Sequence, residues 1–144
     1  MDNNSKFCVE LKVLVNSICR FLGQNSCDRE GKNLTSIQLW IIHYLYENQG
    51  NDIFQRDLEV DFNIRRSTVS GIIQNMEKKG LISRESVERD ARLKKITLTN
   101  DAMMLYQEML AQITLIEKKM TENITEEEWT VFFRVLEKIK KNIQ

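Results

Sequence analysis

The chain contains no proline and only five glycines among its 144 residues. Proline interrupts a helix and glycine weakens one, so the backbone carries few of the residues that normally break helices. We therefore expect long helices to make up most of the fold. A chain of this length has room for one domain around a single core. Its 42% hydrophobic and 29% charged residues are ordinary for a soluble globular protein.

Three threonines indicate where helices begin. Thr35 and Thr125 each stand three residues before a Gln or Glu, which is the pattern of a capping box. Each is also preceded by an apolar residue that can pack one turn further on, as in a hydrophobic staple. Thr99 has the staple but only half of the box, because Ala102 stands where a Gln or Glu is needed.

These starts, together with the apolar periodicity, predict six helices and two short strands joined by a turn. The helices are expected at about 6–23, 36–48, 55–61, 65–79, 100–120 and 126–142, and the strands near 81–85 and 94–98. A tight turn usually carries Gly, Pro or Asn-Gly, whereas this turn, Ser86 to Lys95, is rich in Arg and Lys. Such a turn needs a functional explanation.

Charge is segregated along the chain although the formal net charge is zero. Residues 63–95 hold nine Lys/Arg and four Asp/Glu, a local charge of +5, whereas residues 99–128 hold two Lys/Arg and seven Asp/Glu, a local charge of −5. Salt screens charges beyond about 10 Å, so a basic face can bind phosphate even in a neutral protein.

Other features narrow the class of protein. The longest apolar stretch, Leu39 to Tyr46, is interrupted by a histidine and is far shorter than the roughly 20 residues of a membrane-spanning helix. The first residues lack a secretory pattern, so we expect a cytoplasmic protein. The three cysteines are expected to be reduced thiols, and with a single histidine and no Cys-X-X-Cys we expect neither a metal site nor a cofactor.

An enzyme is the least supported class. The sequence has no Gly-rich phosphate loop, no paired carboxylates in an evident cleft, and no histidine other than His43 to serve a nucleophile.

The helix expected at 65–79 has two different faces. Its buried face is predicted to be Val69, Ile72, Ile73 and Met76, and its opposite face Ser67, Gly71, Gln74 and Lys78, flanked by Ser70 and Asn75. Gly71 costs a helix interior roughly 1 kcal/mol relative to Ala, so its place on the exposed face suggests that something approaches closely there.

The segment before this helix completes a pattern typical of DNA binding. A short helix, a three-residue turn and a second helix with a small polar outer face suit the major groove, and Arg65 and Arg66 lie beside the helix start, where phosphate is favoured. The alternative is that these cations form an ordinary solvated surface. The charged hairpin that follows favours the DNA interpretation.

Three segments resemble the MarR (multiple antibiotic resistance regulator) winged-helix transcription factors: LTSIQLWIIHYL, RDLEVDFNIRRSTVSGIIQNMEKKGLISR and ERDARLKKITLTNDA, within residues 34–102. The resemblance implies a mainly α (α+β) fold, with a winged helix-turn-helix DNA-binding part at 34–98. Residues 1–33 and 99–144 would form a helical dimerisation part within one domain. The chain departs from the family at Ile64 and Arg65, where a capping Ser or Asp is frequent, and at Asp101 and Ala102, where Gly is common.

The same resemblance implies a transcriptional regulator, expected to be a repressor, that binds a pseudo-palindromic operator in double-stranded DNA as a homodimer. Its recognition helix would use Arg65, Arg66, Ser67, Thr68, Ser70, Gly71, Gln74, Asn75 and Lys78, and its wing Arg84, Arg89, Asp90, Arg92 and Lys94. Arg92 would enter the minor groove with its guanidinium oriented by Asp90, and Lys95 would join the contacts to the sugar-phosphate backbone.

The apolar stripes of the first and last helices are expected to bury against each other between two chains. An intramolecular bundle is the alternative.

Release from DNA is expected to follow binding of a small aromatic or phenolic effector near Trp40, His43 and Tyr44, although aromatic residues at helical spacing more often belong to a core. A redox alternative rests on the cysteines. Cys8 and Cys19 would stand about 16 Å apart on one helix, so a disulfide would need Cys27 or a partner chain. A second alternative is a winged helix that binds proteins without binding DNA.

Overall fold

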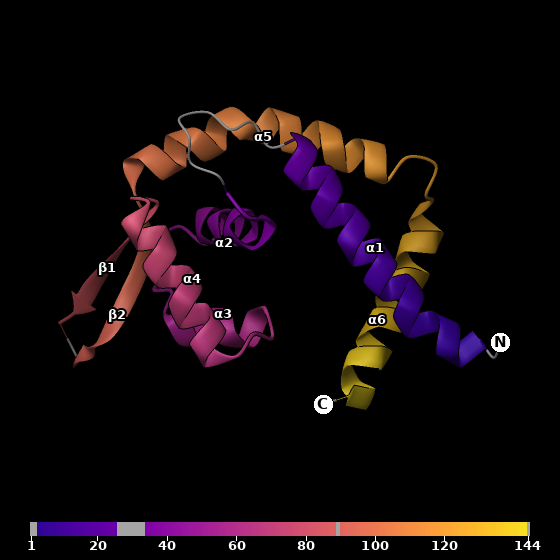
Figure 1. The fold of residues 1–144 in the computed structure, drawn as a ribbon, viewed down its shortest axis with the longest axis horizontal. Helices are drawn as coiled ribbons and strands as arrows, with labels where there is room; N and C mark the ends of the chain where they lie inside the picture. Colours follow the sequence, from indigo (N-terminus) through magenta and orange to yellow (C-terminus); the bar gives the residue numbers. More distant parts are fainter. Residues whose placement is uncertain (1–2, 26–33, 89, 144) are drawn as a thin grey trace. The chain divides into compact units, whose positions relative to one another are not determined.

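The computed structural model describes residues 3–25, 34–88 and 90–143. The elements are α1 (Asn3–Asn25), α2 (Ser36–Glu47), α3 (Gln55–Asp61), α4 (Arg66–Lys78), β1 (Ile82–Val87), β2 (Asp90–Leu98), α5 (Asn100–Met120) and α6 (Glu126–Ile143) (Figure 1). The fold is mainly α with one two-stranded antiparallel sheet, as predicted. Every helix lies where it is predicted, and α3 and α5 have the predicted bounds. None of the described helices has both the length and the apolar composition needed to cross a membrane.

The chain divides into two compact units, Met1–Ala111 and Gln112–Gln144. The core lies in the first unit, where α2, α3, α4, α5, the sheet and the segments just before α3 and β1 supply its buried side chains. These are Leu39, Ile41, Ile42, Leu45, Ile53, Leu58, Val69, Ile73, Met76, Leu81, Ile82, Ile96, Ala102, Tyr106 and Met109. In contrast, α6 has no buried residue, and neither do residues 6–21 of α1.

Two predicted capping boxes begin their helices. Thr125 and Glu128 exchange two hydrogen bonds: the Thr125 N–H donates to the Glu128 carboxylate at 2.8 Å, and the Glu128 N–H donates to the Thr125 hydroxyl at 3.3 Å. At the start of α2, the Thr35 N–H donates to Gln38 Oε1 at 3.1 Å. Each bond satisfies a main-chain group that the first helical turn leaves without a partner.

The β1–β2 hairpin, the wing, is longer than predicted. Its ladder continues to Ser86 opposite Lys94 and Val87 opposite Asp90, so most of the predicted charged turn is strand. Main-chain hydrogen bonds make this ladder, and the side chains of Asp90, Arg92 and Lys94 are exposed to solvent. The alternating apolar pattern that predicts a strand is therefore missing here. The register shifts between Ser86 and Val87, as in a β-bulge.

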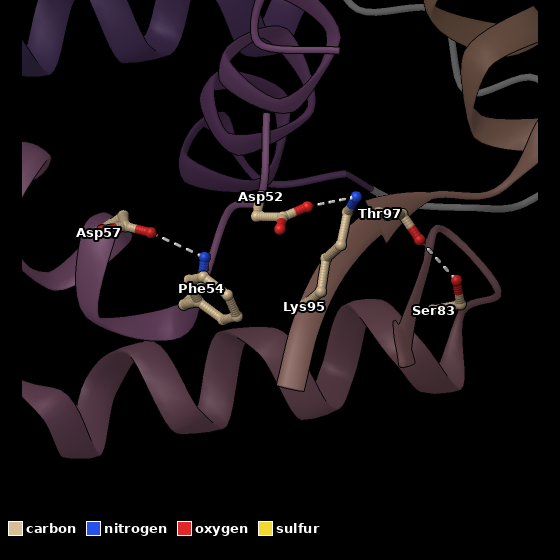
Figure 2. Close-up of polar contacts among 6 residues, drawn as sticks. All are labelled: Asp52, Phe54, Asp57, Ser83, Lys95 and Thr97. Carbon is tan, nitrogen blue, oxygen red and sulfur yellow. Dashed lines mark hydrogen bonds and ion pairs between the residues drawn. The ribbon is translucent and has the colours of Figure 1, made fainter. Parts of the chain in front are cut away.

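The base of the wing is bonded to the segment before α3. The Ile96 N–H donates to the Ile53 carbonyl at 2.8 Å, and an isolated bridge pairs Phe54 with Lys95. Figure 2 shows the Lys95 ammonium directed at the Asp52 carboxylate, with 2.7 Å between nitrogen and oxygen. This segment therefore extends the sheet by one short pairing and sets where the wing leaves the core.

Two further bonds drawn in Figure 2 hold neighbouring backbone in place. The Phe54 N–H donates to the Asp57 carboxylate at 2.8 Å, which caps the start of α3. Across the strands, the hydroxyls of Ser83 and Thr97 are 2.8 Å apart. The turn into α3 and the two wing strands are thus fixed by bonds within the same small region.

The C-terminal end of α4 closes with a Schellman motif. Gly80 has a φ of +68°, its N–H donates to the Glu77 carbonyl, and the Leu81 N–H donates to the Met76 carbonyl, each at 3.0 Å. Glycine adopts this left-handed backbone without the clash that a Cβ atom would cause. The motif turns the chain from α4 directly into the wing.

Tyr44 connects α2 to α3. Its hydroxyl donates a hydrogen bond to the Asp61 carboxylate, and its ring packs edge-on against Phe62 with 5.5 Å between centroids. That hydrogen bond, together with partial burial and the carboxylate charge, raises the pKa of Tyr44 to about 12. The bond requires the protonated tyrosine, so it is lost when the ring ionises.

We predict opposite stability changes for two glycine substitutions. Gly80→Ala should lower the free energy of unfolding by about 1 kcal/mol, because alanine is strained in the left-handed region. Gly71→Ala, in the interior of α4, should raise it by about 0.5–1 kcal/mol, because alanine loses less backbone entropy in a helix. Urea unfolding of both variants measures the difference, and equal effects would contradict the motif at Gly80.

We also predict that Tyr44 ionises near pH 12, away from its ordinary value of 10.0. The contribution of this bond to stability should be complete below pH 10 and lost as pH rises through about 12, because the folded state favours the protonated form. Tyrosinate absorbance follows the titration, and Tyr44→Phe identifies the residue. Asp61→Asn should move the transition back toward the ordinary value; an unchanged titration would contradict the assigned cause.

Candidate nucleic-acid interface

The inner face of α4 anchors this helix in the core. Val69, Ile73 and Met76 are at most 1% exposed, as predicted, whereas Ile72 is only half-buried. These positions lie on one side of the helix, so their burial directs the opposite side away from the core. The packing of α4 thus determines which of its residues face solvent.

The outer side of α4 carries the residues that the sequence predicts for DNA contact. Arg65, Arg66, Ser67, Thr68, Gly71, Gln74, Asn75 and Lys78 are exposed, and Ser70 is half-buried. The Ser70 hydroxyl accepts a hydrogen bond of 2.8 Å from Gln55 Nε2 on α3. The short outer face is therefore also supported by the neighbouring helix.

Gly71 lies on this outer face with open space around it. A Cβ atom built at this position would have no heavy-atom neighbour within 4 Å apart from the adjacent residues and the backbone of its own helix. Packing within the chain therefore gives no reason for glycine here. The sequence-based expectation that an external molecule approaches at Gly71 remains a prediction.

The start of α4 differs from the predicted start by one residue. Arg65 is the N-cap and makes no side-chain capping bond, and the helix begins at Arg66. The preceding turn passes through Asn63, whose φ of +49° is a left-handed conformation that asparagine tolerates better than most residues. The positive end of the helix dipole is left beside two arginine side chains.

A surface cleft of about 510 Å³ lies between α3, the start of α4 and the wing. We call it the basic cleft. It is lined by Phe54, Gln55, Arg56, Glu59, Arg66, Arg84, Arg92, Leu93, Lys94 and Ile96. Five of these residues are cations and one is a carboxylate, so the cleft has a positive potential suited to an anion.

Four of the five cations are residues that the sequence predicts for DNA contact, and Arg56 is the one that is not predicted. Arg56 belongs to the first turn of α3, outside the basic stretch from Asn63 onward. Its position in the cleft results from the packing of α3 against α4 and the wing. The sequence feature that could have indicated Arg56 is its place as a cation on the short helix just before the predicted recognition helix.

Two of the wing cations also have partners on the protein. The Arg84 guanidinium forms an ion pair of 2.5 Å with Glu77 on α4, which lowers the pKa of that carboxyl. The Lys94 ammonium donates a hydrogen bond to the Ser86 hydroxyl across the hairpin. Both side chains therefore help to shape the wing as well as line the cleft.

The contact seen between Asp90 and Arg92 differs from the predicted one. Asp90 Oδ1 accepts a hydrogen bond of 2.9 Å from the main-chain N–H of Arg92, whereas the predicted partner is the Arg92 guanidinium. The carboxylate therefore shapes the backbone at the irregular part of β2 and leaves the exposed Arg92 side chain to line the cleft. Arg89 lies outside the described residues.

Lys95 does not take the predicted place beside the cleft cations. Its ammonium pairs with Asp52 at the base of the wing, and its side chain is 28% exposed. Successive side chains of a strand point to opposite faces, so Lys94 and Lys95 face different sides of the wing. Lys95 therefore fastens the wing to the segment before α3.

The residues predicted to bind an effector have separate neighbours. Trp40 is 38% exposed, the His43 Nδ1 atom lies 2.5 Å from the Tyr106 hydroxyl on α5, and Tyr44 bonds to Asp61 on α3. These three residues do not line the basic cleft, nor a smaller cavity of about 240 Å³ between the end of α2, β2 and the start of α5. An effector site at Trp40, His43 and Tyr44 remains a prediction.

The cysteines on α1 are free thiols in this structure. Cys8 is exposed and Cys19 is half-buried. Cys27, the third residue of the redox alternative, lies outside the described residues.

A family model for the MarR family matches residues 32–93, the segment that contains α2, α3, α4, β1 and the start of β2. The MarR transcription regulator of Oenococcus oeni PSU-1 is 29% identical, with a TM-score of 0.80 over 94% of this chain and 98% of that chain.

Two more distant structures share the fold. The S. aureus MepR–DNA complex is 23% identical, with a TM-score of 0.86 over 99% of this chain and 100% of that chain. The PcaV transcriptional regulator of Streptomyces coelicolor in complex with its natural ligand is 16% identical, with a TM-score of 0.77 over 93% of this chain and 91% of that chain. With a winged helix and a basic cleft in place, residues 32–93 match the MarR family, and the chain is similar over almost its whole length to a MarR transcription regulator.

Proposed function

We propose that the protein is a homodimeric repressor that binds a pseudo-palindromic operator through α4 and the wing and leaves it when a small molecule binds. The basic cleft is the observation that carries this proposal. It joins the first turn of α3, the start of α4 and the wing in one concave surface of positive charge. A related structure, that of MepR, is a complex with DNA.

The cleft suits a phosphate backbone for electrostatic reasons. Arg56 and Arg66 come from the helices and Arg92 from the wing, so the backbone would be neutralised from two sides. Neutralising phosphates releases condensed counterions, and affinity then falls steeply with salt concentration. The zero net charge of the chain does not oppose this, because screening restricts the interaction to nearby groups.

The outer face of α4 supplies the groups for reading sequence. Its short polar side chains, centred on Gly71, allow the helix to approach base edges in the major groove. The wing would place Arg92 in the neighbouring minor groove. The electrostatic potential of this groove is more negative where the groove is narrow, which attracts an arginine. A dimer would present two α4 helices about 34 Å apart to successive turns of one face of the duplex.

Exposed aromatic residues support the homodimer. On α6, Phe132 is 41% and Phe133 58% exposed, and Trp129 contacts both rings with 5.6 and 5.5 Å between centroids. A cluster of this kind is costly in water, and a second copy of the same helix would cover it.

Release by an effector requires a ligand that prefers one spacing of the two α4 helices over another. PcaV, which shares the fold, is in complex with its natural ligand. In this chain, we propose that a small aromatic or phenolic effector acts near Trp40, His43 and Tyr44. The contact between His43 and Tyr106 joins α2 to α5, so a ligand that competes for it would act on the connection between these helices.

Selection of bound duplexes from a random pool tests the DNA proposal. We expect an inverted repeat with half-sites one helical turn apart, and a steep fall of log affinity with log salt. Arg92→Ala should lower operator affinity by about tenfold and reduce the salt slope, because it removes one cation from each half-site. Lys118→Ala, which removes a cation from α5, is the control and should bind as the wild type does. Unselective, salt-independent binding would refute the proposal.

Sedimentation equilibrium tests the dimer. Phe133→Asp should shift the protein from dimer to monomer, because a carboxylate would be buried without a partner in the proposed interface. Val60→Asp provides a matched control on α3, where valine is 68% exposed, and should leave the dimer unchanged. A wild-type protein that sediments as a monomer at micromolar concentration would contradict the proposal.

A further inference from the structure

Gln38 is the one buried polar side chain among the described residues, with 4% of its surface exposed. It lies in the first turn of α2, where it completes the cap of that helix. Its amide also contacts the far end of α4. A buried amide must satisfy both its oxygen and its nitrogen, so these partners determine how the group is oriented.

The partners of Gln38 leave one orientation for its amide. Gln38 Oε1 accepts from the Thr35 main-chain N–H at 3.1 Å and from the Lys79 ammonium at 3.2 Å. Both partners are donors only, so the atom that faces them must be the oxygen. The nitrogen, Nε2, is then directed at Asn75 on α4.

The orientation of the Gln38 amide determines the orientation of the Asn75 amide. Gln38 Nε2 donates to Asn75 Oδ1 at 2.7 Å, so the oxygen of the second amide must face Gln38. The Nδ2 group lies on the other side of the planar amide, and Asn75 is exposed. No hydrogen bond from this Nδ2 to another group is found within the described part of the chain.

We propose that Gln38 is a positioning residue that makes Asn75 a hydrogen-bond donor toward DNA. This inference rests on the proposed function of α4. The acceptor on DNA is a base-edge atom, such as purine N7, guanine O6 or thymine O4, or a phosphate oxygen. Asparagine pairs bidentately with adenine by using both its nitrogen and its oxygen, and here Gln38 holds the oxygen. Asn75 therefore makes a single donated bond.

We call the hydrogen bonds from Thr35 through Gln38 to Asn75 the relay. Gln38→Glu tests the relay while keeping the helix cap, because glutamate also completes a capping box. One carboxylate oxygen would accept from Thr35 and Lys79, and the other would face Asn75 as an acceptor. The Asn75 amide should then turn over and present its oxygen to DNA. Asn75→Asp should present an oxygen directly, and Gln49→Glu, on the exposed α2–α3 connection, controls for the added charge.

Duplex selection and affinity are measured for all three variants. Asn75→Asp should lower affinity for the wild-type operator by about tenfold, Gln38→Glu should lower it several-fold, and Gln49→Glu should leave it unchanged. If the acceptor is a base edge, both relay variants change the preferred base pair at the same position of each half-site. If it is a phosphate, both weaken every duplex equally. Wild-type affinity and selectivity in Gln38→Glu, with altered binding in Asn75→Asp, would overturn the relay.

The amide resonances of the free protein test the relay without DNA. The Asn75 side-chain N–H₂ signals, assigned by their loss in Asn75→Asp, should shift downfield in Gln38→Glu because they then donate to a carboxylate. Unchanged signals would overturn the proposed orientation. Failure of the wild type to bind any duplex would instead refute the proposed function, and the resonances separate these two results. Urea unfolding verifies that each variant is folded.

Discussion

Burial of one side of α4 is the interaction on which the rest of the structure depends. Val69, Ile73 and Met76 are almost completely removed from water, and each contributes on the order of 1.5–3 kcal/mol relative to an exposed position. Because helical residues spaced by three or four share a face, anchoring this side leaves the polar side outward. The position of the helix and the exposure of its polar face therefore have one common cause. Two residues after α4 ends, the left-handed Gly80 and the bond from the Leu81 N–H to the Met76 carbonyl lead the chain straight into the wing.

The charged residues of the wing have two kinds of role, which their amino-acid types alone do not separate. Lys95 and Asp52 fasten the base of the hairpin, whereas Lys94 and Arg92 line the basic cleft. Neighbouring residues of a strand point to opposite faces, so two adjacent lysines serve different purposes. An exposed ion pair such as that of Arg84 and Glu77 adds little to stability, and its effect is to hold a cation beside the cleft.

A chain of zero net charge presents a cationic surface because its charges are sorted in space. Residues that are separate in sequence, Arg56 on α3 and Arg92 on the wing, meet across one cleft. The polar relay from Thr35 through Gln38 to Asn75 adds a different kind of control, in which a buried amide sets the polarity of an exposed one. Charge would supply affinity for phosphate and hydrogen-bond polarity would supply selection among bases, and the fold arranges the two separately.

The sequence by itself determined the helices, the two-stranded wing and the polar face of α4, because caps, apolar periodicity and glycine placement act within one or two helical turns. It also contained the resemblance to the MarR family. Only the tertiary structure decided that the ladder continues through the charged turn, that Arg56 joins the cleft, that Asp90 bonds to the Arg92 backbone, and that Lys95 pairs with Asp52. The bond from Gln38 to Asn75 spans 37 positions in the sequence. Local patterns report neighbours along the chain, whereas partners at such separations are selected by how whole elements pack.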